Sequence, residues 1–166
     1  MIPVSPDSPA NLPQSPAVPE PERPSGGAVS VGIVLVSHSR ALAEAALDLA
    51  RRLIVAVDVP VELAAGLADG GLGTDPGAVV EAVELLAERC EGVLVLADLG
   101  SGIMSAEMAL EMLDPALAER TRLSAAPFVE GLLGAYGAAG IGKDLQAVAA
   151  EADGAAEAKR SQVAAF

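Results

Sequence analysis

The chain has 166 residues, a formal net charge of −13 and a mean hydropathy of +0.46. The acidic charge and an aromatic content of only 2% argue against a nucleic-acid-binding surface, which needs basic patches and stacking platforms. One cysteine and one histidine exclude an intramolecular disulfide framework and a structural zinc site, and the low cysteine use fits a cytoplasmic protein.

The first 28 residues differ in composition from the rest of the chain. They hold eight of the twelve prolines and show no aliphatic periodicity, so residues 1–28 are expected to form a disordered, proline-rich tail. The tail has no basic start followed by an apolar segment, which argues against a signal peptide. We expect one folded domain over residues 29–158 and a disordered end at 159–166.

Beyond the tail, short aliphatic runs alternate with segments of helical periodicity. No run of about 20 mainly apolar residues is present, so insertion into a membrane is not expected. In chain order the predicted elements are a strand at 29–36, a helix at 39–54 with Leu42, Ala46, Leu49 and Leu53 as its apolar stripe, a strand at 61–66, a glycine-rich loop at 67–77, a helix at 78–90, a strand at 92–100, a helix at 105–113, a strand at 121–127, and helices at 128–139 and 143–158.

This alternation predicts an α/β fold with an open, mainly parallel sheet flanked by helices on both faces. Right-handed crossovers favour the strand order 2-1-3-4. In such a sheet, ligands bind where neighbouring connections diverge, at the carboxyl ends of strands 1 and 3. His38 follows strand 1 and Asp98 ends strand 3, so we expect both side chains at this crevice.

His38 lies in the motif VSHS, at the predicted start of a helix. Ser37 or Ser39 can cap that helix, and a helix start offers free N–H groups to a phosphate. Asp98 can hold one ring nitrogen of His38 and leave the other free to attack. The alternatives stay open at this point, because a lone histidine at a helix start often has no chemical role and Asp98 can equally be a helix cap.

Four motifs occur together in this order: GIVLVSHSRALAEA, AAGLADGGLGTDP, VLADLGSGIMSAEMALEML and RLSAAPFVEGLLGA. They resemble the DhaM family, the phosphotransferase subunits of PEP-dependent dihydroxyacetone kinases, whose core is similar to the IIA domain of mannose-type sugar phosphotransferase systems. The resemblance covers about residues 29–153. Gly102 departs from the family's frequent alanine after DLGS, and the longer members carry HPr-like and enzyme-I-like domains for which 166 residues leave no room.

The resemblance implies that His38 accepts a phosphoryl group from the phosphohistidine of HPr. It further implies transfer to ADP on the nucleotide-binding subunit of the kinase, with separate carriers, no cofactor and a cytoplasmic homodimer. The glycine ridge Gly131, Gly134 and Gly137 is a candidate dimer surface, although it can instead pack within the chain. A sugar-transporter IIA component, which passes phosphate to a IIB partner, and a non-catalytic anion-binding module are the rival functions.

The resemblance also suggests roles for the residues around His38. His38 is the phosphoryl acceptor through its Nε2 atom, giving a tele-phosphohistidine, and Asp98 orients the ring. The phosphoryl oxygens are expected to bind donors at Ser39, Gly100, Ser101 and Thr74. Thr74 has an alternative role, since it or Asp75 can simply cap the following helix. Glu130, in the first turn of the helix after Pro127, is either a neighbour of the site or a solvated acid.

Overall fold

A computed structural model describes residues 29–55 and 58–165, so the tail expected at 1–28 lies outside the described residues. The described elements alternate between strands and helices, as the sequence predicts. In chain order they are β1 (Val29–Ser37), α1 (Arg40–Leu53), β2 (Val61–Ala65), α2 (Pro76–Ala87), β3 (Cys90–Ala97), α3 (Gly100–Met112), α4 (Pro115–Ala118), β4 (Thr121–Ser124), α5 (Phe128–Gly140) and α6 (Leu145–Ala164).

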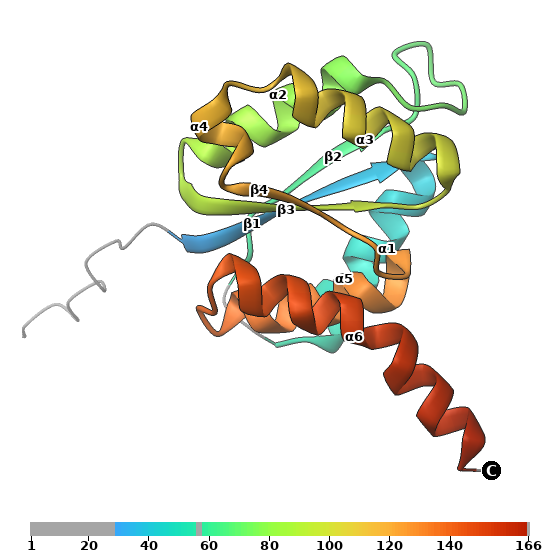
Figure 1. Ribbon diagram of the computed structural model, residues 1–166. Coiled ribbons are helices and arrows are strands. Elements are labelled where there is room, and N and C mark those ends of the chain that lie inside the picture. Colours follow the sequence, from blue (N-terminus) through green and yellow to red (C-terminus); the bar gives the residue numbers. More distant parts are fainter. Residues whose placement is uncertain (1–28, 56–57, 166) are drawn as a thin grey trace, which may run out of the picture.

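The described strands form one parallel sheet in the order β2-β1-β3-β4, which confirms the predicted topology. Figure 1 shows α2, α3 and α4 over one face of the sheet and α1, α5 and α6 over the other. β1 and β3 are the two central strands, and Val36 pairs with Ala97 near their carboxyl ends. The connections that leave these two ends therefore start side by side.

Both faces of the sheet are buried, which explains the unbroken aliphatic runs in β1 and β3. Successive residues of β1 point to opposite sides. Ile33 and Leu35 belong to the core cluster shared with α1, α5 and α6, whereas Val34 and Val36 belong to the cluster shared with α2 and α3. The sheet is thereby fixed between two apolar layers, and its carboxyl edge is a rigid support for a site.

The apolar stripe predicted for the first helix is wrong in detail. The buried residues of α1 are Ala43, Ala46, Leu47 and Ala50, while Leu42, Leu49 and Leu53 are exposed. The small alanine side chains let α1 approach the sheet closely, and the larger leucines take the outer face.

Several boundaries also differ from the predicted ones. α3 begins at Gly100 rather than at 105, and Cys90 opens β3 instead of ending a helix. α6 continues to Ala164, so residues 159–164 are helical where a disordered end is expected. This stretch is rich in helix-forming residues, and the Lys159 ammonium pairs with the Glu130 carboxylate on α5.

The glycine ridge of α5 packs within the chain. A Cβ atom on Gly131 would meet the Ala126 side chain at 2.5 Å, and one on Gly134 would meet the backbone oxygen of Glu151 on α6 at 2.8 Å. The ridge thus allows α5 and α6 to pack closely and offers no support for a dimer surface. Within the described residues, no helix has the length and apolar character needed to cross a membrane.

Candidate active site

His38 and Asp98 meet at the carboxyl ends of the two central strands, as the sequence predicts. The Asp98 amide donates to the carbonyl oxygen of Val36 at 3.1 Å, which extends the β1–β3 pairing by one residue. In return the His38 amide donates to Asp98 Oδ2 at 2.9 Å. The paired strand ends and this backbone-to-carboxylate bond therefore place both residues before any contact of the His38 ring is considered.

The Asp98 carboxylate accepts four hydrogen bonds, two on each oxygen. Oδ2 accepts from the His38 amide and from Ser37 Oγ, both at 2.9 Å. Oδ1 accepts from His38 Nδ1 at 2.9 Å and from the Leu99 amide at 2.7 Å. The side chain of Asp98 is only 5% exposed. A carboxylate held on both oxygens cannot rotate freely, so it presents Oδ1 to the histidine ring in a fixed direction.

Burial raises the pKa of Asp98, but the hydrogen bonds from His38, Ser37 and Leu99 outweigh burial and lower the pKa below its ordinary value. Asp98 is therefore a carboxylate at neutral pH and can only accept hydrogen bonds. His38 Nδ1 must then be the protonated ring nitrogen of the neutral ring, an assignment that follows from the hydrogen-bond network. Nε2 is left with its lone pair.

Nε2 of His38 faces the first turn of α3. Ser101 Oγ lies 2.6 Å from this nitrogen, at the right distance to donate its hydroxyl hydrogen to the lone pair. The His38 side chain is 25% exposed, so solvent or a ligand reaches the ring at this side. The arrangement combines an oriented ring, an available nitrogen lone pair and a hydroxyl that can move to a group bound there.

The other predicted phosphoryl-binding residues differ in their contacts with the His38 ring and with Ser101. Gly100 is exposed at the start of α3, next to Ser101. Thr74 Oγ1 lies 2.8 Å from Ser105 Oγ and 3.5 Å from the Ser101 carbonyl oxygen, so it contacts α3 rather than the ring. Ser39 accepts from the Leu42 amide at 3.3 Å and is the N-cap of α1.

Among the described glycines, Gly102 approaches His38 and Asp98 most closely. A Cβ atom at this position would lie 2.9 Å from Asp98 Oδ1 and 3.7 Å from His38 Cε1. The glycine therefore leaves room for the carboxylate against α3. This position, noted in the sequence only as a departure from a family pattern, is directly packed on the site.

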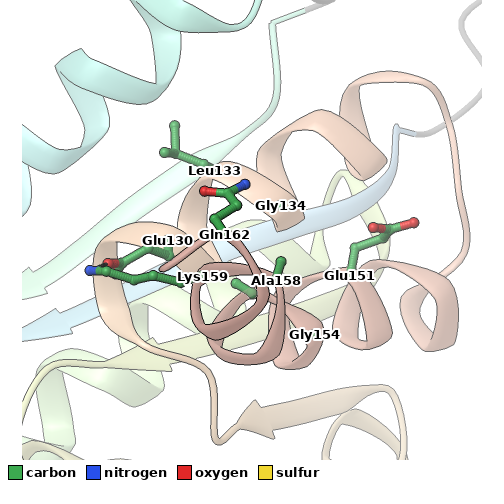
Figure 2. A pocket seen from close by; sticks show the side chains of 9 residues that line it. Glu130, Leu133, Gly134, Glu151, Gly154, Ala158, Lys159 and Gln162 are labelled. Atoms are coloured by element: carbon green, nitrogen blue, oxygen red, sulfur yellow. Dashed lines mark hydrogen bonds and ion pairs between the residues drawn. The ribbon is translucent and has the colours of Figure 1, made fainter. Parts of the chain in front are cut away.

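Glu130 is not a member of the His38 hydrogen-bond network. Its carboxylate pairs with Lys159, and this hydrogen bond is the main cause that lowers the pKa of Glu130. Figure 2 shows both side chains at a groove of about 520 Å³ between α5 and α6. The groove contains none of the residues around His38, so Glu130 holds α6 in place rather than supporting the ring.

Sequence reasoning considered Ser37 only as a helix cap and did not assign it to the site. Its side chain is completely buried at the end of β1, and its Oγ has two acceptors within reach, Asp98 Oδ2 and the Ser39 carbonyl oxygen at 3.1 Å. The signal in the sequence was a hydroxyl residue closing an otherwise aliphatic strand. Among the described residues, no three histidine, cysteine or acidic side chains gather in a way that would hold a metal ion.

Comparison with known proteins gives one matching family model. The model EIIA-man, described as the fructose IIA component of the phosphotransferase system, matches residues 32–149. A solved structure titled as the unknown function protein EF1359 superposes with a TM-score of 0.68 and 31% identity, covering 75% of this chain and 93% of that chain. The family model covers most of the sheet and all of the residues around His38 described above.

Similar curated proteins are phosphoryl donor subunits DhaM of PEP-dependent dihydroxyacetone kinases. Those of Klebsiella michiganensis and Escherichia coli are 44% identical over 135 residues, which is 80% of this chain and 28% of their own length. The subunit from Listeria innocua kinase 2 is 37% identical over 101 residues, covering 61% of this chain and 79% of its own length. This chain thus spans little more than a quarter of the enterobacterial relatives and most of the length of the Listeria protein.

Proposed function

Because the chain belongs to the EIIA-man family and to its DhaM members, we propose that it is a phosphohistidine carrier whose acceptor atom is Nε2 of His38. One observation carries the proposal: Nδ1 is held by a buried carboxylate while Nε2 keeps its lone pair beside Ser101. The ring is thereby oriented for nucleophilic attack through a single nitrogen.

In the first half-reaction, the Nε2 lone pair attacks the phosphorus atom of an incoming phosphohistidine. The new N–P bond forms as the donor's P–N bond breaks, and the donor imidazole keeps that electron pair. No proton leaves His38, so positive charge develops on its ring while Nδ1–H stays bonded to Asp98. The Asp98 carboxylate stabilises this charge, as a fixed counter-charge does in a pre-organised site.

In the second half-reaction, a terminal phosphate oxygen of ADP attacks the same phosphorus atom. The N–P bond breaks, its electron pair returns to Nε2, and ATP is formed. Ser101 Oγ must leave Nε2 in the phosphorylated state and is then placed to donate to a phosphoryl oxygen. Backbone donors at Gly100 and near Ser39, whose own amide donates to Ser37 Oγ at 3.2 Å, complete the proposed phosphoryl-binding set, with Thr74 further out.

The proposed partners are HPr as donor and the ADP-binding subunit of a dihydroxyacetone kinase as acceptor. The names of the similar proteins support this choice, because they describe phosphoryl donor subunits of that kinase. A cytoplasmic setting is in keeping with the free, buried thiol of Cys90. A homodimer remains part of the proposal on the family resemblance alone, and sedimentation at micromolar concentration tests it.

The test is incubation with PEP, enzyme I and HPr, followed by intact mass spectrometry. We expect the mass of one phosphate on wild-type protein, labile to acid and stable to base as a phosphoramidate is, and none on His38→Ala. The phosphorylated protein is then mixed with the ADP-loaded kinase subunit or with a sugar-transporter IIB protein. Discharge only to IIB would replace the kinase assignment, and acid-labile phosphate on His38→Ala would end the proposal.

A further inference from the structure

The outward face of α3 is apolar although it faces solvent. Five of the fourteen exposed large apolar side chains in the described residues belong to the segment Leu99–Met112. Met104, Met108 and Met112 are 62%, 54% and 61% exposed and follow one another at intervals of four residues. We call these three side chains the methionine stripe. Within the described part of the chain they are all of the methionines.

The stripe is not used to hold this domain together. α3 packs on the sheet and on α2 through its opposite face, where the buried residues are Gly102, Ser105, Ala106 and Ala109. In the described part of the chain the core is complete without the three methionines. Apolar side chains in contact with water are unfavourable, and a contiguous exposed apolar patch usually marks a surface that binds a partner.

The stripe begins at the active site. Ser101, whose Oγ contacts His38 Nε2, and Met104, Met108 and Met112 occupy positions i, i+3, i+7 and i+11 of one helix face. At 1.5 Å per residue, this line extends about 16 Å away from the ring. Any protein that reaches Nε2 therefore meets the start of the methionine stripe.

The charged side chains of α3 and of the neighbouring helix α2 all have one sign. Glu107 and Glu111 are exposed on α3, and Glu81 and Glu84 are exposed on the neighbouring helix α2. Neither helix contains a lysine or an arginine. A second copy of this acidic chain would meet like charges here, whereas a partner with lysine or arginine side chains around an apolar centre would be complementary.

Resting on the proposed function, we propose that the methionine stripe is the docking site of the protein that phosphorylates His38. The partner carries an apolar contact patch bordered by basic side chains. The His38 side chain is recessed and only 25% exposed, so the partner must present its phosphoryl group on a projecting surface side chain. Methionine side chains are flexible and suit a short-lived complex of this kind, because they repack at low cost.

The test compares two phosphoryl donors, phosphorylated HPr and the small molecule phosphoramidate. The variants are Met108→Glu and Met112→Glu, at exposed helical positions where glutamate is well tolerated. We expect KM for phosphorylated HPr to rise about 10-fold with kcat unchanged, the scale for losing one contact of a docking patch. The rate with phosphoramidate should not change, because that donor needs no docking surface.

Val163→Glu, at an exposed apolar position near the end of α6, is the matched control and should behave as wild type. Leu49→Glu tests the exposed leucines of α1 as the competing surface. An unchanged KM in both methionine variants, or a rise in KM for Leu49→Glu instead, overturns the proposal. A change in the sedimentation of the methionine variants also overturns it, because the stripe would then bind a second copy of the chain. The same holds if the substitutions slow only the transfer of phosphate from His38 to the ADP-loaded acceptor.

The two proposals fail differently. If wild-type protein takes phosphate from neither phosphoramidate nor phosphorylated HPr, the proposed function is wrong, and the docking proposal that rests on it is wrong as well. If His38 of the wild-type protein is phosphorylated as proposed but the methionine variants keep the wild-type KM for phosphorylated HPr, only the docking surface is wrong.

Discussion

Replacing Asp98 by asparagine separates the shape of this side chain from its charge. The carboxylate accepts two hydrogen bonds on each oxygen, but an amide has only one accepting atom. With its NH₂ group at the Oδ2 position, the asparagine still accepts from His38 Nδ1 and the Leu99 amide. The His38 amide then loses its acceptor, while Ser37 can turn to the Ser39 carbonyl oxygen.

The expected loss of rate follows from the charge that this geometry removes. A hydrogen bond to a charged group contributes about 1.5–3 kcal/mol, and in the proposed reaction positive charge develops on the His38 ring as the phosphoryl group arrives. At about 1.4 kcal/mol per factor of ten, phosphorylation of Asp98→Asn should be slower by roughly 10- to 100-fold. Asp98→Ala, which also frees the ring, should be slower by about 100-fold or more.

The assay is a single-turnover measurement of phosphate on His38, with phosphoramidate as donor so that docking does not enter. Asp144→Asn is the matched control, because Asp144 accepts from the Ala147 amide as the N-cap of α6 and asparagine caps a helix equally well. Asp98→Asn at the wild-type rate would refute the reasoning.

Asp98 also accepts hydrogen bonds from two backbone amides, those of His38 and Leu99. Asp98→Ala should therefore lower the free energy of unfolding by about 1–3 kcal/mol.

Three further predictions follow from the same network and from the tail. Ser37→Ala removes one donor from Asp98 Oδ2 and should slow phosphorylation of His38 about 5- to 10-fold, with a change in the ¹⁵N NMR shifts of the ring; unchanged rate and shifts would leave Ser37 a packing residue. Because the pKa of Asp98 is lower in the folded protein than in the unfolded chain, ionised Asp98 stabilises the fold above the unfolded-state pKa of about 3.9, and this stability is lost as pH falls through the folded-state pKa. The stability of Asp98→Asn should therefore depend less steeply on pH below about 4 than that of wild type. An identical acid transition in both proteins would contradict this. Deleting residues 1–28 should leave the melting temperature and phosphate uptake nearly unchanged, and a large drop in either would show that the tail binds the domain.

The sheet and the pairing of His38 with Asp98 were predictable because both depend on simple patterns. Aliphatic runs mark strands buried on both faces, and parallel topology brings the ends of β1 and β3 together without knowledge of side-chain packing. The early start of α3 was missed because Gly100 and Gly102 have low helix propensity, although contacts with the site stabilise that first turn.

Side-chain partners were less predictable because they depend on distances that sequence spacing does not contain. Ser37 and Ser39 are both serines next to His38, yet only Ser37 points inward to Asp98. Glu130 lies in the last of the four family motifs, yet it pairs with Lys159, almost thirty positions later in the chain, and not with the residues around His38. In α1 the periodicity allowed a leucine stripe or an alanine stripe inside, and close packing selected the alanines.

The site is built from two different strands, so phosphate uptake by His38, as proposed above, would report native pairing of the sheet. Asp98 is bonded to the main chain and side chains of β1 and the residue after it, but it belongs to the segment that follows β3. A shift of β3 by one residue against β1 would turn its side chains to the opposite face and remove the carboxylate from the ring. Under that proposal, the fraction of molecules that can form phosphohistidine reports the fraction in which these central strands are in register, which spectroscopic measures of total helix or strand content do not distinguish.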